Sequence, residues 1–295
     1  MTQPPVQDSP EGVRPAIDTG TGPAVVLVHG QPGSGQDWAA VAGLLAGDHR
    51  VVAPDRPGWG SDPRPARGIA ANADALEEAL QAAGVPSPVT AVGHSLGGGV
   101  ALQLAIRHPE RVGALVLIGS VGVAVALSGF DRLLTVPMLG DGILRAGTAS
   151  LRRALITMTR YSDSHPGTRV ASVVEAIPTV RAALGRDGGP ALGRGRQSFL
   201  VEQRALLAET PELERALSRI GVPTVVVTGA SDRVVPRSAA RALAQAVPGA
   251  ELVVLPGGHL LPFERPQDIA TVVSRYSALV SNLRDEPPPR GTPAA

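Results

Sequence analysis

The sequence predicts an α/β fold in which a doubly wound, mostly parallel sheet carries an inserted helical cap. Short apolar runs alternate with helical patterns along most of the 295 residues, and this alternation builds a parallel sheet with helices on both faces. The alternation breaks once, over residues 121–205, where helical patterns and loops continue without a convincing strand. Because 43% of the residues are hydrophobic, the chain can bury a sizeable core.

Six short apolar runs are typical of strands in such a sheet. In chain order they are AVVLV at 24–28, RVVAPD at 50–55, SPVTAVG at 87–93, RVGALVLIG at 111–119, VPTVVVTG at 222–229 and AELVVLPG at 250–257. The fourth run opens a stretch of 19 uncharged residues, 112–130, which is long enough to span a bilayer. Glycines and serines interrupt that stretch, so we interpret its first part as a buried strand and expect no membrane span.

Helical spacing of apolar residues marks most of the segments between these runs. The predicted helices lie at 36–47, 68–84, 95–110, 212–220 and 238–247, and a last helix follows Pro266. Gly84 and Pro109 are typical terminators for the second and third of them. The predicted domains are therefore a core at 11–120 and 206–283, a helical cap insertion at 121–205, and flexible tails at 1–10 and 284–295.

Composition excludes several classes of function. The chain has no cysteine, which rules out disulfides, thiolate catalysis and cysteine-based zinc sites. No pair of histidines shares a helix face, so we expect no metal. The 27 basic and 26 acidic residues nearly cancel, which gives no sign of a nucleic-acid surface. The N-terminus is polar and rich in proline, without the apolar segment of a signal peptide, and a cytoplasmic protein is expected.

The pentad Gly93-His94-Ser95-Leu96-Gly97 carries the chemistry. It follows a predicted strand and opens a predicted helix. A strand-turn-helix bend forces its central residue into a crowded backbone conformation, and the flanking glycines are required because side chains there would collide. The serine oxygen then projects above the carboxyl ends of the strands, where open α/β sheets bind ligands. The amide of Leu96, at the start of the helix, points at the same space.

A serine hydroxyl needs a base to take its proton, and the base needs an orienting carboxylate. Two residues stand at suitable places, each just after a later strand. Asp232 follows the run at 222–229, and His259 follows the run at 250–257. The segment between them is long enough for one helix and one strand. We therefore predict that Ser95, Asp232 and His259 form a catalytic triad.

With these motifs the chain resembles the α/β-hydrolase superfamily over nearly its whole length, in particular its serine-nucleophile, esterase-like branch with a helical cap. The matching segments are HGQPGSG, DRPGWGSD, GHSLGG, GASDRVVP and GGHLLPFERP. The resemblance implies an oxyanion hole made by the backbone amides of Gln31 and Leu96. Two departures are visible: the segment before the first run is short, so the family's N-terminal antiparallel strands are expected to be reduced, and the cap has no subfamily motif.

Other polar residues receive structural interpretations. The acid of this family can instead follow the strand at 112–119, but the residues there are Gly119 and Ser120, which favours Asp232. His29 is interpreted as bracing its loop. The side chain of His94 is expected to point away from the site and to pack. The carboxylates Asp37, Asp55 and Asp62 are interpreted as helix-start, loop and turn residues.

The triad predicts attack on an activated carbonyl through an acyl-enzyme, with no cofactor. The first expectation is hydrolysis of a carboxylic ester of a small, largely apolar substrate. Lactonases, C–C bond hydrolases and cofactor-free perhydrolases use the same triad and stay open, as does a non-catalytic ligand receptor on this fold. We expect the apolar cap to line the substrate pocket, with Phe130, Leu134, Met138 and Met158 as candidates. The sequence does not predict the oligomeric state.

Overall fold

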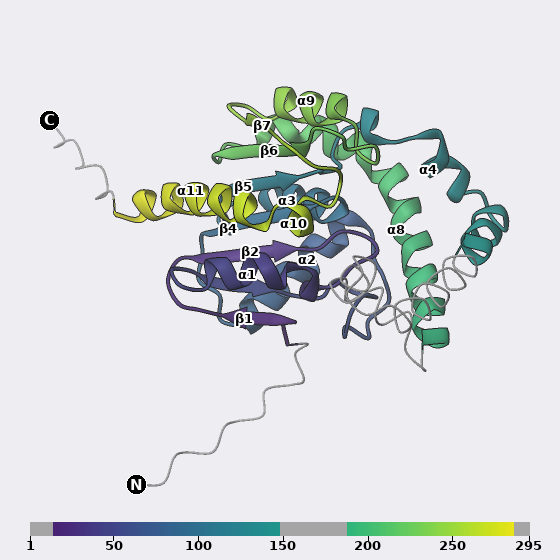
Figure 1. Cartoon of the computed structure of the whole chain (residues 1–295), viewed down its shortest axis with the longest axis horizontal. Helices are drawn as coiled ribbons and strands as arrows, with labels where there is room; N and C mark the ends of the chain where they lie inside the picture. Colours follow the sequence, from purple (N-terminus) through teal and green to yellow (C-terminus); the bar gives the residue numbers. More distant parts are fainter. Residues whose placement is uncertain (1–13, 148–187, 286–295) are drawn as a thin grey trace, which may run out of the picture.

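Seven strands form one sheet in the order β1-β3-β2-β4-β5-β6-β7 (Figure 1). The computed structural model describes residues 14–147 and 188–285. The strands are β1 (Ile17–Thr19), β2 (Ala24–Val28), β3 (Arg50–Ala53), β4 (Val89–His94), β5 (Val112–Ile118), β6 (Thr224–Gly229) and β7 (Glu251–Leu255). Strands β2 to β7 correspond to the six predicted runs and pair in parallel. The predicted fold class is confirmed.

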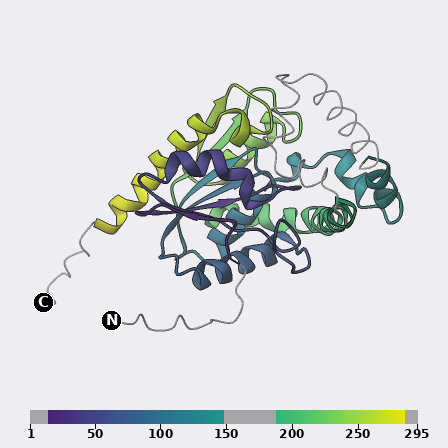
Figure 2. The same ribbon diagram turned by 60° about the horizontal axis from the view of Figure 1, so that its bottom comes forward.

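Helices cover both faces of the sheet (Figure 2). One face packs against α1 (Ala39–Leu45) and α11 (Pro266–Asp285). The other face packs against α2 (Ile69–Ala82), α3 (Leu96–Arg107) and α9 (Arg237–Ala246). Successive side chains of a strand point to opposite faces, so a strand covered on both sides must be apolar throughout. The strands β2, β4, β5 and β6 are buried along their whole length, which explains why they were predicted from short apolar runs.

The N-terminal antiparallel part is as small as expected. Among the described residues it consists of the three-residue strand β1, which runs antiparallel to β3. The apolar stretch at 112–130 begins with β5, which lies in the sheet between β4 and β6. Within the described ranges, no helix combines the length and the apolar character needed to cross a bilayer.

The described part of the cap contains η2 (Ala124–Ala126), α4 (Gly129–Leu134) and the long helix α8 (Gly188–Ala216), which ends in the 3₁₀ turn η3 (Leu217–Arg219). Helix α8 runs through the predicted domain boundary at 205/206 without a break. Its C-terminal part, together with η3, is the helix predicted at 212–220. Because α8 contacts α4 on one side and α2 and α3 on the other, it connects the cap to the core.

Parts of the domain prediction fall outside the described residues. These are the tails at 1–10 and 286–295 and the cap segment 148–187. Helix α11 ends at Asp285, so it continues slightly beyond the predicted end of the core at residue 283.

Candidate active site

Ser95 occupies a sharp turn between β4 and α3. Its backbone has φ 54° and ψ −121°, a conformation that costs a non-glycine residue about 1–3 kcal/mol. The neighbouring glycines make this turn feasible. A Cβ on Gly93 would lie 2.3 Å from the carbonyl oxygen of Gly97, and a Cβ on Gly97 would lie 2.3 Å from that of Val28. The predicted reason for the glycines, collision of larger residues with the backbone, is therefore correct.

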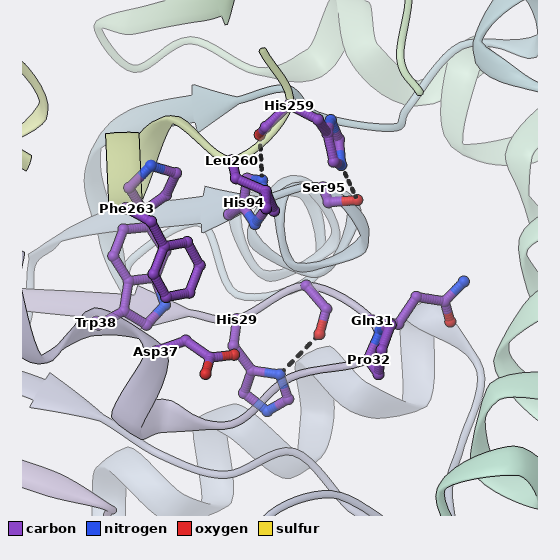
Figure 3. A pocket seen from close by; sticks show the side chains of 12 residues that line it. His29, Gln31, Pro32, Asp37, Trp38, His94, Ser95, His259, Leu260 and Phe263 are labelled. Atoms are coloured by element: carbon purple, nitrogen blue, oxygen red, sulfur yellow. Dashed lines mark hydrogen bonds between the residues drawn. The ribbon is translucent and has the colours of Figure 1, made fainter. Parts of the chain in front are cut away.

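The three residues of the predicted triad meet at the carboxyl edge of the sheet. The Nε2 atom of His259 lies 3.1 Å from Ser95 Oγ (Figure 3). The Nδ1 atom of the same ring lies 2.9 Å from Asp232 Oδ2. Because a carboxylate only accepts, Nδ1 carries the proton and Nε2 is left to accept the serine hydroxyl hydrogen. A hydroxyl bonded in this way can lose its proton to the ring as it attacks a carbonyl.

Asp232 is held in its ionised form. Its Oδ1 atom accepts the backbone N–H groups of Val234 and Val235, at 2.9 and 3.0 Å. Burial by itself raises the pKa of this carboxyl, but the hydrogen bond from His259, the charge of that ring and the two amides outweigh burial, so the pKa lies below its ordinary value. A permanent negative charge here fixes the orientation of the imidazole.

The alternative acid position lies beside the same pair. A Cβ on Gly119, which has φ +49°, would lie 3.1 Å from His259 Nδ1 and 3.2 Å from Asp232 Oδ2. The end of β5 therefore reaches the site, but it brings no carboxylate there. Ser120 turns its hydroxyl to the carbonyl of Val121 instead.

The loop from His29 to Pro32 follows β2 and faces Ser95; it is named the oxyanion loop here after the role that the family resemblance implies for it. Gln31 lines the same cavity as Ser95, and Leu96 opens α3, where N–H groups lack an acceptor within the helix. His29 braces this loop, as expected. Its Nδ1–H donates to Gly30 O at 2.8 Å, and its Nε2 accepts the Arg56 N–H at 3.0 Å. Burial and the nearby charge of Arg56 lower the pKa of His29, which keeps the ring neutral for both bonds.

A cavity of about 210 Å³ adjoins Ser95. Its walls come from the oxyanion loop, from the 3₁₀ turn η1 (Gly35–Trp38), from the turn at Ser95 and from the segment that includes α10 (Leu261–Glu264). Twelve described residues line it: His29, Gly30, Gln31, Pro32, Asp37, Trp38, His94, Ser95, His259, Leu260, Pro262 and Phe263. Most of the surface is therefore apolar or aromatic, and Asp37 is the one acidic group in this described lining.

The prediction that the cap lines this pocket is not met by the described residues. Phe130 is 57% exposed, Met138 is 89% exposed, and Leu134 is buried, and none of the three lines the cavity. The short helix α4 packs against α8, so Leu134 fills that contact rather than the pocket. Met158 lies outside the described residues. The lining residues instead follow Gln31 and His259 along the chain, and this adjacency was the signal that would have found them.

The expectation for His94 is wrong. Its ring does not point away but lines the cavity, with its centroid 4.9 Å from that of His259. Its Nε2–H donates to the backbone carbonyl of His259 at 2.9 Å (Figure 3). Strand β4 ends at His94, so the turn carries the ring over the edge of the sheet rather than onto a covered face. Burial, followed by the nearby charge of His259, lowers its pKa to about 4.

The carboxylates interpreted as structural make local contacts. Asp55 accepts hydrogen bonds from the backbone of Gly35 and from Ser61, while Asp62 accepts from Arg64. Asp37 accepts the Ser34 N–H, at the start of η1, as expected for a helix-start residue. Within 14–147 and 188–285, no group of three His, Asp or Glu residues is arranged to hold a metal ion.

Comparison with known proteins agrees with this architecture. Residues 23–266 match the alpha/beta hydrolase fold family. The 2-hydroxymuconate semialdehyde hydrolase of Pseudomonas putida is 32% identical over 278 residues, which cover 88% of this chain and 89% of that protein. The magnesium-chelatase 30 kDa subunit of Rhodobacter capsulatus is 32% identical over 254 residues, which cover 83% and 84%.

A solved structure shows the same fold. A thermophilic esterase from Thermogutta terrifontis superposes with a TM-score of 0.67 at 24% identity, covering 90% of this chain and 92% of the esterase. The family match spans the turn at Ser95, the segment of Asp232 and the segment of His259, which the structure brings to one edge of the sheet. The chain therefore belongs to the alpha/beta hydrolase fold family.

Proposed function

We propose that this protein is a serine hydrolase that cleaves a carboxylic ester of a small, largely apolar substrate through an acyl-enzyme. The observation that carries the proposal is the hydrogen-bonded relay from Asp232 through His259 to Ser95, in the wall of a cavity. A structural turn serine would need neither the imidazole nor the carboxylate behind it.

In the proposed reaction, Ser95 Oγ attacks the ester carbonyl carbon while its proton passes to His259 Nε2. Asp232 stabilises the imidazolium that forms. The amides of Gln31 and Leu96 bind the oxygen on which negative charge develops, and each such donor contributes about 3 kcal/mol to transition-state stabilisation. His259 then gives its proton to the departing alcohol. Water, activated by the same ring, releases the acid from Ser95.

The cavity supports a short, neutral acyl or alcohol group. Its volume of about 210 Å³ lies below the roughly 300–1,000 Å³ of pockets that enclose drug-sized ligands, so a small group fits it best. Trp38, Leu260 and Phe263 provide apolar wall. The described lining contains no arginine, so an anionic substrate gains no arginine counter-charge there.

Labelling with a fluorophosphonate probe tests the nucleophile. We expect covalent labelling of the wild-type protein, none of Ser95→Ala, and full labelling of Ser238→Ala, which changes an exposed serine on α9. A folded wild-type protein that resists the probe would instead support the non-catalytic receptor.

A series of p-nitrophenyl esters tests the substrate class. Activity should rise from acetate to butyrate or hexanoate as the acyl chain fills the cavity, and hydrolysis should show a burst of nitrophenol when deacylation is slow. Activity confined to the acetate would argue against the apolar pocket.

Hydrolysis of a C–C bond is the second candidate, because one relative at 32% identity is named as a 2-hydroxymuconate semialdehyde hydrolase. This reaction would use the same three side chains, Ser95, Asp232 and His259. Turnover of a dienoic keto acid with a kcat/KM above that of every nitrophenyl ester would favour this candidate. The apolar walls formed by Trp38, Leu260 and Phe263 favour the neutral ester.

A further inference from the structure

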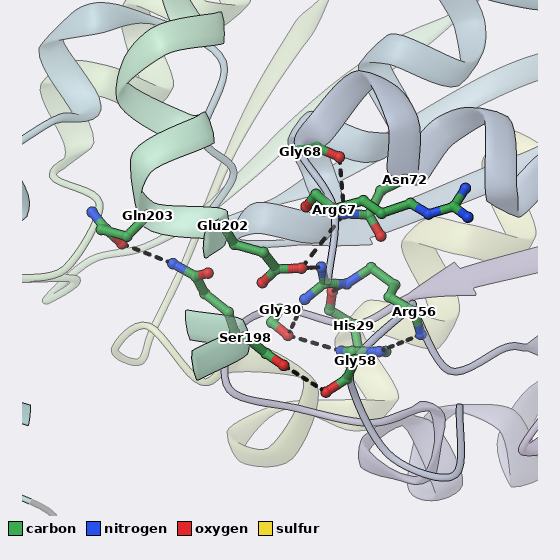
Figure 4. A network of polar contacts seen from close by, with 11 residues as sticks. His29, Gly30, Arg56, Gly58, Arg67, Gly68, Asn72, Ser198, Glu202 and Gln203 are labelled. Atoms are coloured by element: carbon green, nitrogen blue, oxygen red, sulfur yellow. Dashed lines mark hydrogen bonds and ion pairs between the residues drawn. The ribbon is translucent and has the colours of Figure 1, made fainter. Parts of the chain in front are cut away.

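Two neighbouring residues of α8 reach the oxyanion loop from the cap side, although neither lines the cavity (Figure 4). Glu202 and Gln203 are each 1% exposed, so both are buried polar side chains. Such groups are costly to bury unless they are bonded. Their partners connect them by two separate routes to the oxyanion loop, one at the carbonyl of Gly30 and one at the side chain of Gln31.

The first route passes through Arg56. The carboxylate of Glu202 forms a buried ion pair with Nη1 of Arg56. The same guanidinium donates from Nη2 to Gly30 O at 2.9 Å and from Nε to His29 O at 3.1 Å. The position of Glu202 therefore determines where Arg56 holds these two carbonyl groups.

Holding the carbonyl of Gly30 also orients the amide of Gln31. The two groups belong to one planar peptide unit, and this bond is not among the cis bonds of the described residues. In a trans peptide the C=O and the N–H point in opposite directions. Gly30 O accepts from Arg56 and from His29 Nδ1, so the N–H of Gln31 has a fixed direction. A Cβ on Gly30 would lie 3.0 Å from Ser95 Cβ, so this peptide directly adjoins the nucleophile.

The second route holds the side chain of Gln31. Its Nε2 donates to Gln203 Oε1 at 2.9 Å, while its Oε1 is buried and has no hydrogen-bond partner among the described residues. Gln203 Nε2 donates in turn to Asp131 Oδ1 at 2.8 Å. Asp131 also accepts from Ser128 at the start of α4. One glutamine thus joins the oxyanion loop, α8 and α4.

We propose that Glu202 and Gln203 are positioning residues for the oxyanion hole, so that helix α8 of the cap sets the direction of the Gln31 amide. This inference rests on the proposed function. Glu202 acts through Arg56 on the peptide plane, and Gln203 acts through the side chain of Gln31. Neither residue touches the substrate.

The inference predicts an effect on kcat without an effect on KM, because negative charge on the carbonyl oxygen develops only in the transition state. Gln203→Met should lower kcat for p-nitrophenyl butyrate about ten- to a hundredfold, as small misplacements in a site do, with KM within about twofold. A trifluoromethyl ketone, which forms a tetrahedral oxyanion on serine, should bind more weakly by a similar factor. Glu202→Gln should behave in the same way.

Glu209→Gln is the matched control. Glu209 also lies on α8 and also binds the core, since its Oε2 accepts the Ala70 N–H at 2.9 Å. That contact is with α2 and not with the oxyanion loop. The control should alter the unfolding midpoint but leave kcat and the affinity for the ketone unchanged.

Two further variants keep the test decisive. Glu202→Gln leaves Arg56 buried without a counter-ion; if that variant does not fold, Arg56→Met combined with Glu202→Met removes both charges and should show the same loss of kcat. The double variant Gln31→Met with Gln203→Met should lose no more than Gln203→Met alone, because both changes break one contact.

If a folded variant of Glu202 or Gln203 keeps the wild-type kcat, the proposal is overturned for that residue. It is overturned for both residues if the control Glu209→Gln loses as much kcat as the test variants do. A rise in KM at constant kcat would also overturn it. Failure of the proposed function gives a different result, since the wild-type protein would then neither hydrolyse the ester nor react with the fluorophosphonate.

Discussion

Acidification should destabilise this protein through His94. In the folded state its buried ring donates to the carbonyl of His259, and burial followed by the charge of that ring lowers its pKa to about 4, from an ordinary value of 6.5. The unfolded chain therefore binds a proton that the folded protein excludes whenever the pH lies between these values. Stability is lost as the pH falls through 6.5 and the loss is complete near pH 4.

The size of the effect follows from the two pKa values. One pKa unit corresponds to about 1.4 kcal/mol, so the whole shift from 6.5 to about 4 amounts to roughly 3 to 4 kcal/mol. At pH 7 little of this has been lost. At pH 5, which is about 1.5 units below the pKa of the unfolded state, about 2 kcal/mol of the free energy of unfolding is gone.

Urea unfolding of the wild-type protein and of His94→Asn at pH 7 and pH 5 measures this contribution. The wild-type protein should lose about 2 kcal/mol more than the variant between these pH values. The comparison is needed because the pKa of His29 is also lowered, and that ring destabilises both proteins alike. Between pH 7 and pH 8 the free energies of unfolding of the wild-type protein and of His94→Asn should differ by a nearly constant amount. Equal losses between pH 7 and pH 5 would refute the reasoning.

Three further predictions concern the site and the core. Asp232→Asn should lower kcat for a nitrophenyl ester by about 10⁴-fold with little change in KM, because the imidazole loses its orienting charge; a loss below tenfold in steady-state kinetics would contradict this role. Gly97→Ala places a Cβ 2.3 Å from a backbone oxygen and should abolish fluorophosphonate labelling. As a control, a Cβ on the helical Gly43 meets no described atom within 4 Å, so Gly43→Ala should raise the free energy of unfolding by up to about 1 kcal/mol. Glu77→Gln leaves buried Arg111 without its charged partner and should lower the free energy of unfolding in urea by about 3–5 kcal/mol. An unchanged urea midpoint would show that this ion pair is dispensable.

The sequence alone determined the six parallel strands of the sheet and the place of the three residues of the proposed triad. Strands covered by helices on both faces are largely apolar along their whole length. The strands β2, β4, β5 and β6 were therefore recognisable as short hydrophobic segments. Parallel strands place their carboxyl ends at one edge, so residues just after three strands were expected to meet there. Ser95, Asp232 and His259 do meet, because each lies within a few residues of a strand end.

Only the tertiary structure decided what surrounds the triad. The ring of His94 faces His259, the cavity is lined from η1 and α10 rather than from the predicted cap residues, and Arg56 pairs with Glu202, 146 positions away. Such contacts leave no periodic pattern or local motif, because they depend on how a long helix crosses the core. Backbone elements follow from local spacing of apolar residues, whereas contacts between distant side chains exist only once those elements have packed.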